Sequence, residues 1–181
     1  MLRLIFIILW ILPMNTFAIS RDVGRPLKIS LSNNGLLPFD INSHGLVQIT
    51  FYSAVLGKLL SISNSYEIEP ELLEAAYFDW DSDRYILRLR KNLRFHNGRM
   101  ANSDDLEFSL VRFFLTTGRA DQLVFLRQIK GITDLKPGVF KPGSVRGITK
   151  VDEYTLGISL DELNPSFLYS LSEAWILCCP S

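Results

Sequence analysis

The chain is poor in the residues from which metal sites and disulfide frameworks are built. Its 181 residues include two cysteines, the neighbours Cys178 and Cys179, and two histidines, His44 and His96. This set excludes a disulfide framework and a four-cysteine zinc site, and the histidines lack the spacing of a helical metal pair. Adjacent Cα atoms lie ~3.8 Å apart, below the usual disulfide range of about 4.4–6.8 Å, so we interpret the cysteine pair as incidental. We predict no metal and no cofactor.

The chain has no excess of charge of one sign, because it contains 19 basic and 19 acidic residues. A neutral chain has no long-range field that would attract nucleic acid. The hydrophobic fraction of 48% excludes a disordered charged tail. The Gly-x-Ser-x-Gly elbow and the glycine-rich phosphate loop do not occur. We therefore predict that the chain is not an enzyme.

A long hydrophobic run occurs once, at the beginning of the chain. Arg3 is followed by the apolar run Leu4–Leu12 and by Pro13, and small residues precede a possible cleavage point after Ala18. This pattern is typical of a secretory signal peptide, and the run is shorter than the roughly 20 apolar residues of a membrane span. We predict a signal peptide over residues 1–18, with cleavage after Ser20 as the second choice. The mature chain is then exported, in the periplasm, with no stable membrane insertion.

The first part of the mature chain gives weak patterns. Leu27–Leu31 alternates apolar and polar residues as a half-buried strand does, and Val47–Leu60 is compatible with a helix. Ser61–Ser65 is expected to be a loop. Pro70–Ala76 fits either a helical turn or the approach to a strand, and periodicity does not decide between them. Asp79–Asp83 is a polar turn.

The clearest pattern runs from residue 85 to residue 110. Between Tyr85 and His96 the odd positions are mostly apolar and the even ones mostly basic, which predicts a strand closed by Asn97-Gly98. Asn102 can cap the helix that follows, and Asp105 can reach back to it as in a capping box. The expected buried stripe of that helix consists of Leu106, Leu110, Phe113 and Phe114.

The last third predicts a second strand and another helix. Loops are expected at Pro137-Gly138 and Pro142-Gly143, and Asp152-Glu153 is the turn before a strand over 154–160. Asn164 is the expected cap of a helix with Pro165 at its first position. Its buried face would contain Phe167, Leu168 and Leu171. The fold class predicted from these elements is α+β, a mixed α/β domain.

Two charged sets allow a functional interpretation and a plainer one. Arg88, Arg90 and Arg94 could form a nucleic-acid surface, but arginines on a solvent face more often pair with acids and cover apolar surface with their stems. The aspartates of the Asp79–Asp83 turn alternate as calcium ligands do, but the glycine and the distal glutamate of a calcium loop are missing. His96 continues the polar face of a strand and is expected to be solvated.

Four segments carry a resemblance to a known family. They are Leu89-Arg90-Lys91 with Phe95, Asn97-Gly98, Asp105 and Phe108-Ser109; Pro70-x-Leu72; Val151–Leu156; and Asn164–Leu168. In this order and spacing they resemble the extracytoplasmic solute-binding proteins of the oligopeptide/dipeptide/nickel ABC-transporter family (family 5). Two positions depart from that pattern: Asn102 replaces a capping threonine, and Ala76 stands where the family usually has a tryptophan.

The resemblance implies a partial periplasmic-binding-protein type II fold. Residues 19–181 would form the N-terminal part of the family domain, with the start of lobe 1 and its inserted subdomain, and the second lobe missing. It implies a truncated binding component of a peptide-class importer, with a peptide or other small solute and an inner-membrane permease as partners. The loop Ser43, His44, Gly45 and Leu46 would line the ligand cleft. An ordinary surface loop is the alternative for these four residues.

Three other functions stay open beside this one. A small exported interaction protein would use apolar surface left by the missing lobe. A remnant of a binding protein would have no activity. A secreted hydrolase has only scattered Ser, Asp and His residues in its favour.

Overall fold

The computed structural model describes residues 56–116, 124–136 and 141–172. The chain divides into two units, Met1–Leu31 and Ser32–Ser181, and every described residue belongs to the second. The predicted signal peptide, the predicted strand Leu27–Leu31, the loop Ser43–Leu46, the Pro137-Gly138 loop and the cysteine pair lie outside the described residues. They remain predictions.

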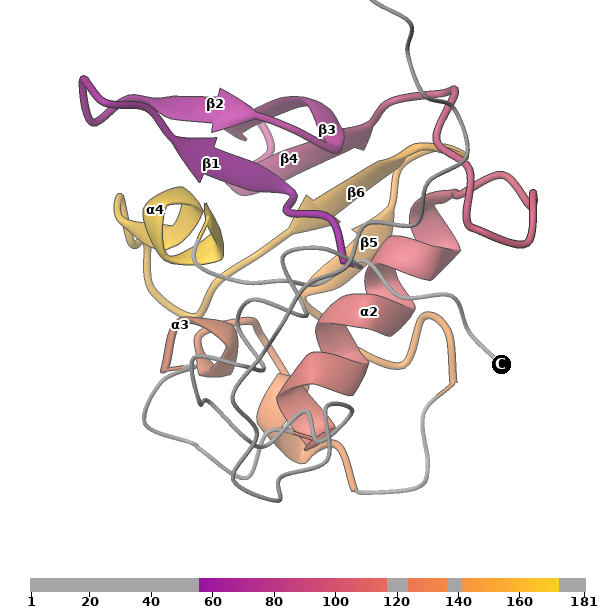
Figure 1. The fold of residues 1–181 in the computed structure, drawn as a ribbon. Helices are drawn as coiled ribbons and strands as arrows, with labels where there is room; N and C mark the ends of the chain where they lie inside the picture. The colour runs from indigo at the N-terminus through magenta and orange to yellow at the C-terminus, as the bar shows by residue number, and fades with distance from the viewer. Residues whose placement is uncertain (1–55, 117–123, 137–140, 173–181) are drawn as a thin grey trace, which may run out of the picture. The chain divides into compact units, whose positions relative to one another are not determined.

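The described residues form a small hairpin, a four-stranded antiparallel sheet and short helices (Figure 1). The hairpin pairs β1 (Leu60–Ile62) with β2 (Ile68–Pro70). The sheet has the order β3-β4-β6-β5 and contains β3 (Leu73–Asp79), β4 (Arg84–Leu89), β6 (Thr155–Ile158) and β5 (Ile148–Lys150). The helices are α2 (Ser103–Thr116), α3 (Val124–Arg127), the 3₁₀ turn η1 (Ile132–Asp134) and α4 (Phe167–Ser172).

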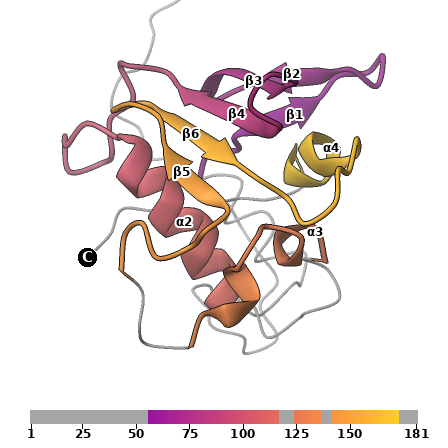
Figure 2. The ribbon, with the colours of Figure 1, turned by 180° about the vertical axis from the view of Figure 1, so that it is seen from behind.

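Strand β4 places its odd-numbered residues in the core, as its alternating sequence predicts. Leu87 lies opposite Leu156 in β6, and both side chains are fully buried. Helix α2 packs against β5 and β6, and α4 packs against the β1–β2 hairpin. Front and rear views show α2 and α3 on the same side of the sheet (Figures 1 and 2). The fold class is therefore mixed α/β, as predicted.

Strand β4 ends earlier than its sequence predicts. The alternation continues to His96, but the strand stops at Leu89 because the chain turns there, and the Leu93 N–H donates to the Arg90 carbonyl at 3.4 Å. Ile86, which shares the polar face by position, is buried. Ile86 lies between Tyr77 and Gly157 on the neighbouring strands. Packing against these strands buries its side chain, although the alternating pattern predicts that it is exposed to solvent.

The predictions for residues 56–65 are wrong in part. Residues 56–60 are not helical, and Ser61 and Ile62 belong to β1 rather than to a loop. The strand forms because it pairs with residues 68–70, a partner that local periodicity does not reveal. The turn itself is closed by the Ser63 N–H, which donates to the Glu67 carbonyl at 2.8 Å. Of the two interpretations given for Pro70–Ala76, the approach to a strand is the correct one, because β3 begins at Leu73.

Helix α4 joins the sheet through a line of aromatic rings. Tyr85 stacks against Phe167 with ring centroids 4.9 Å apart, and Phe167 lies 6.0 Å from Phe125. The Asn164 side chain accepts the Ser166 N–H at 2.9 Å, in the turn that precedes the helix. The helix begins at Phe167, so Ser166 holds the cap position, and the prediction of Asn164 as the cap with Pro165 at the first position is wrong by two residues. Phe167 and Leu171 are fully buried, as predicted, whereas Leu168 is half-buried.

Helix α2 confirms the predicted apolar stripe with one addition. Leu106 and Leu110 are fully buried, and Phe113 and Phe114 are half-buried. Val111, which the stripe omitted, is fully buried as well. Within the described ranges, no helix has the length and apolar character needed to cross a membrane.

Candidate functional site

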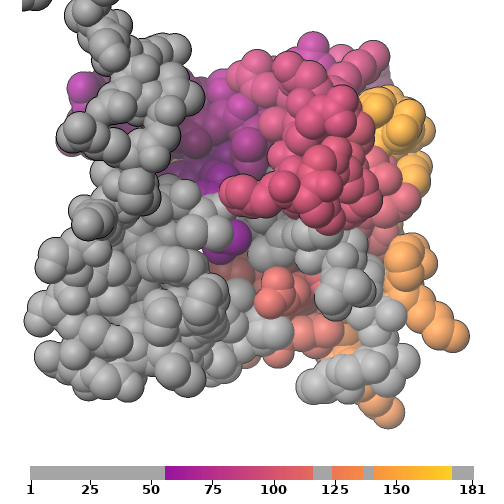
Figure 3. Space-filling model, turned by 45° about the vertical axis from the view of Figure 1, so that its right-hand side comes forward, coloured from indigo at the N-terminus to yellow at the C-terminus, as the bar shows by residue number. Residues whose placement is uncertain are grey.

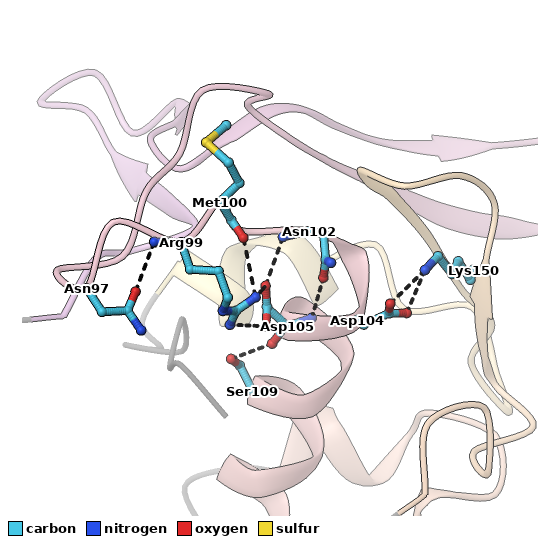
Figure 4. Close-up of polar contacts among 8 residues, drawn as sticks. All are labelled: Asn97, Arg99, Met100, Asn102, Asp104, Asp105, Ser109 and Lys150. Atoms are coloured by element: carbon cyan, nitrogen blue, oxygen red, sulfur yellow. Dashed lines mark hydrogen bonds and ion pairs between the residues drawn. The ribbon is translucent and has the colours of Figure 1, made fainter. Parts of the chain in front are cut away.

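The most organised polar site in the described part of the chain surrounds the start of α2. We call it the α2 entry network. It contains Asn97, Arg99, Asn102, Ser103, Asp104, Asp105 and Lys150, most of which are drawn in Figure 4.

A tight turn leads the chain into this network. The Gly98 N–H donates to the Phe95 carbonyl at 2.8 Å, and Gly98 has a φ of 84°. Glycine adopts this left-handed conformation without steric cost, which explains the Asn-Gly pair at the end of the predicted strand. The Asn97 side chain then accepts the Arg99 N–H at 3.0 Å. The turn therefore fixes where Arg99 leaves the backbone.

Asn102 and Asp105 form the predicted capping box. The Asn102 side-chain oxygen accepts the Asp105 N–H at 3.1 Å, and the Asp105 carboxylate accepts the Asn102 N–H at 2.9 Å. Each side chain thus satisfies a backbone N–H that has no partner inside the helix. The prediction made from the spacing of these two residues is confirmed (Figure 4).

Arg99 completes the coordination of the Asp105 carboxylate. The two guanidinium nitrogens Nη1 and Nη2 lie 2.9 and 2.7 Å from Oδ2 and Oδ1, a bidentate pair. Asp105 is 2% exposed, and the Arg99 guanidinium lies 4.8 Å from the centre of the Phe95 ring. Charge-assisted bidentate bonds are stronger and more directional than neutral ones, so this pair locks the turn onto the helix.

Two further contacts tie the helix start to the far strands of the sheet. The Lys150 ammonium in β5 lies 2.7 Å from the Asp104 carboxylate. The Ser103 hydroxyl donates to the Asp152 carbonyl at 2.9 Å, in the turn between β5 and β6. The Tyr154 N–H donates to the Asp152 carboxylate at 2.8 Å, and this bond holds the pKa of Asp152 below its usual value. The network therefore connects segments distant in sequence.

Glu107 is a buried acid one turn further along α2. Its side-chain oxygen accepts the Gly143 N–H at 2.8 Å, which attaches the 141–147 loop to the helix. Burial raises the pKa of Glu107, although the Gly143 N–H acts in the opposite direction. Asp104 adds a raising effect and Lys150 a lowering one.

Three buried serine hydroxyls are engaged in structural hydrogen bonds. Ser103, Ser109 and Ser172 each donate to a backbone carbonyl, those of Asp152, Asp105 and Tyr169. His96 is exposed, on the turn before the network. Among the residues that the structure describes, no group of three or more His, Cys, Asp or Glu could hold a metal ion. The network positions the backbone at the start of α2.

The aspartate turn and the arginines form hydrogen bonds with nearby side chains and backbone groups of the same domain. Asp79 accepts the Ser82 hydroxyl and the Asp81 N–H, and the Ser82 bond lowers the pKa of Asp79. Arg90 donates to the carbonyls of Glu71 and Pro70 at 2.6 and 3.2 Å, and Arg94 to that of Gly98 at 3.0 Å. The expected acid partners of these two arginines are thus replaced by backbone carbonyls.

The sequence reasoning missed Arg99, Ser103, Lys150 and Glu107. Arg99 carried a usable signal, because an arginine directly after an Asn-Gly turn and six residues before a capping acid can fold back on that acid. Lys150 and Ser103 had none, since their partners depend on the pairing of β5 and β6. Glu107 looks like any helix-surface acid until the 141–147 loop covers it.

The comparison with protein families decides what this scaffold belongs to. A sequence profile of bacterial extracellular solute-binding proteins, family 5 (middle region), matches residues 67–177, which is most of the chain. The chain belongs to family 5. The match includes β2 to α4 and with them the whole α2 entry network. The resemblance drawn from four sequence segments is confirmed.

Solved structures of family 5 type show the same fold. The unliganded open form of MppA, a periplasmic murein tripeptide binding protein, has a TM-score of 0.62 at 23% identity, over 76% of this chain and 27% of that one. Haemophilus influenzae OppA in complex with the peptide RPPGFSPFR has a TM-score of 0.56 at 22% identity, over 74% and 27%. Campylobacter jejuni NikZ with Ni(L-His) has a TM-score of 0.50 at 21% identity, over 65% and 21%.

These similarities show part of the type II periplasmic-binding-protein fold, as the family 5 resemblance implied. The chain spans less than a third of the length of each of these structures. The comparison with curated proteins gave no significant match.

Proposed function

We propose that the chain is the solute-binding component, or a part of one, of a peptide-class ABC importer. Residues 1–18 act as the cleaved signal peptide, and residues 19–181 form the N-terminal part of the family 5 domain in the periplasm. Its partners are a peptide or another small solute and an inner-membrane permease. It binds without covalent chemistry and is not an enzyme.

The observation that carries this proposal is the family match over residues 67–177 together with the α2 entry network inside it. The network reproduces the strand, turn and capped helix on which the resemblance was first based. Solved neighbours hold a nine-residue peptide in one structure and Ni(L-His) in another. Peptides and small metal chelates are therefore the ligand classes to test.

Within this chain we propose Ser43, His44, Gly45 and Leu46 as the ligand-contacting loop. The choice rests on the resemblance to family 5, in which a loop at this position lines the cleft. One lobe supplies only part of the burial that a ligand pocket needs, so we expect the chain alone to bind weakly.

Titration by NMR tests the proposal in the weak-binding range. The protein is expressed with its own N-terminal segment and titrated with tri- to pentapeptides, and in parallel with Ni(L-His). We expect saturable shifts centred on residues 43–46 for one of the two ligand classes. Calorimetry on the same samples should show binding weaker than micromolar.

The two histidines offer a matched pair of variants. His44→Ala should abolish the ligand response, whereas His96→Ala, at an exposed turn outside the proposed loop, should leave it unchanged. Equal responses in both variants would reject the loop as the site. No response of the unmodified protein to either ligand class would reject solute binding by this chain.

A further inference from the structure

Acidic and basic residues are separated in the sequence of the β3–β4 hairpin. Residues 67–83 contain only acidic charged residues, and residues 84–103 only basic ones. The acids are Glu67, Glu69, Glu71, Glu74, Asp79, Asp81 and Asp83, and the bases are Arg84, Arg88, Arg90, Lys91, Arg94 and Arg99. The two strands are antiparallel, with Asp79 opposite Arg84 at one end and Leu73 opposite Leu89 at the other. The turn 79–83 at one end of the hairpin is therefore acidic and the turn 90–94 at the other end is basic. Arg84 lies at the acidic end, and Glu69, Glu71 and Glu74 lie at the basic end.

The acidic turn, residues 79–83, presents an aromatic ring to solvent. Trp80 is 78% exposed, and its ring meets the half-buried Phe78 edge-on with centroids 4.8 Å apart. Asp81 and Asp83 beside it are exposed. A large exposed indole between carboxylates is suited to receive an arginine or lysine side chain, by cation–π attraction and by ion pairing.

The basic turn, residues 90–94, carries charge that the described part of the chain does not neutralise. Lys91 and Arg94 are exposed, and Arg94 and Arg90 donate to backbone carbonyls. Within the described ranges, the ion pairs of the structure use other cations, namely Arg99, Arg146 and Lys150. Neutral carbonyls hold a guanidinium in place and leave its charge available. In the space-filling view the rose-coloured segment after β4 forms a continuous part of the surface (Figure 3).

We propose that the acidic turn of one molecule docks on the basic turn of a second copy of this chain. Trp80 and its neighbouring carboxylates would receive Lys91 and Arg94 of the second copy. A six-residue strand such as β4 is ~20 Å long, so the two turns of one molecule cannot reach each other. The contact is head-to-tail and leaves one free turn at each end, which allows further copies to add. A nucleic acid would use the basic turn but would leave Trp80 and the acidic turn without a partner.

Sedimentation velocity of the full chain tests this contact. At about 10 mM ionic strength, where the Debye length is about 30 Å, the weight-average sedimentation coefficient should rise with protein concentration; at about 1 M it should not. The acidic-turn variant is Trp80→Ala with Asp81→Asn and Asp83→Asn. Asparagine tolerates the φ of 52° found at residue 83. The basic-turn variant is Lys91→Gln with Arg94→Gln; Arg90 is kept because it holds the Pro70 and Glu71 carbonyls.

Mixing the two variants gives the decisive result. Each alone should be monomeric, since it has lost one of the two surfaces, whereas their equimolar mixture should form dimers and nothing larger. The matched controls are Lys130→Gln with Lys136→Gln, and Asp161→Asn with Glu162→Gln, at exposed positions away from both turns. They should associate like the unmodified protein, and thermal melting should show all variants folded. A monomeric unmodified protein, association of either variant alone, or a mixture that stays monomeric would overturn the proposal.

Discussion

At the scale of single residues, Asn102 has the clearest energetic role. Replacing Asn102 by alanine removes the acceptor of the Asp105 N–H and should lower the free energy of unfolding by about 1 kcal/mol. Urea denaturation measures the change. Asn102→Ser is the control, because serine caps equally well and should leave stability close to that of the unmodified protein. Equal losses in both variants would show that the cap contributes nothing.

Glu107 makes stability depend on pH. Burial raises its pKa in the folded state above the ordinary value of 4.5, so the folded protein holds this proton more tightly than the unfolded chain. Below 4.5 both states are protonated and the effect is absent; as pH rises through 4.5 and the folded pKa, this residue lowers stability. Glu107→Gln removes the titration and keeps an oxygen for the Gly143 N–H.

Denaturation at a series of pH values checks this expectation. The free energy of unfolding of Glu107→Gln, relative to the unmodified protein, should increase above pH 4.5 and reach a plateau. Glu162→Gln, at an exposed position, serves as the control for the loss of one surface carboxylate. A flat difference for Glu107→Gln would contradict the raised pKa.

At the scale of elements, two glycines are required for different reasons. At Gly147 a Cβ atom would lie 2.6 Å from the Lys130 nitrogen and 2.7 Å from the Ser159 oxygen, both backbone atoms that cannot move aside easily. At Gly98 there is open space, but φ is 84°. We expect Gly98→Ala to cost about 1 kcal/mol from left-handed strain, and Gly147→Ala about 1–3 kcal/mol or more from overpacking.

Thermal and chemical denaturation of the two variants test this order. Gly147→Ala should also disturb the bonds that join Gly147 to Lys130 and Ser159, which amide hydrogen exchange at Gly147 and Ser159 would detect. Gly98→Ala should leave those amides protected. A reversed order of destabilisation would mean that the surrounding backbone yields more readily than its contacts suggest.

The sequence predicts an element well when the contacts that form it join residues close together in the chain. The capping box needed only Asn102 and Asp105 three residues apart, so it was predictable. The strand β1 was missed because its partner is β2, and the end of β4 because a turn interrupted an unbroken alternation. The Glu107 anchor depends on a loop 36 residues away along the chain. The predicted ligand loop lies outside the described residues and stays a prediction.

At the scale of the whole molecule, the predicted signal peptide can be tested directly. Expression in a secreting host should yield a mature chain that begins at Ile19, or at Arg21 if the second cleavage point is used. Intact-mass measurement and N-terminal sequencing give the position. Ala18→Arg should block the first point, whereas the conservative Ala18→Ser should be processed normally. Recovery of the uncleaved chain from the unmodified gene would reject the prediction.

The central position of β4 affects how a growing polypeptide can fold. Its buried residues Tyr85 and Leu87 contact Ile158 and Leu156, which the ribosome adds only much later. Contacts of such large sequence separation form slowly, because the intervening loop must be closed first. A nascent chain that has reached the end of α2 still lacks β6 and cannot complete the sheet. Under the proposed export, this delay would keep the polypeptide unfolded for passage through a translocation channel before its core closes.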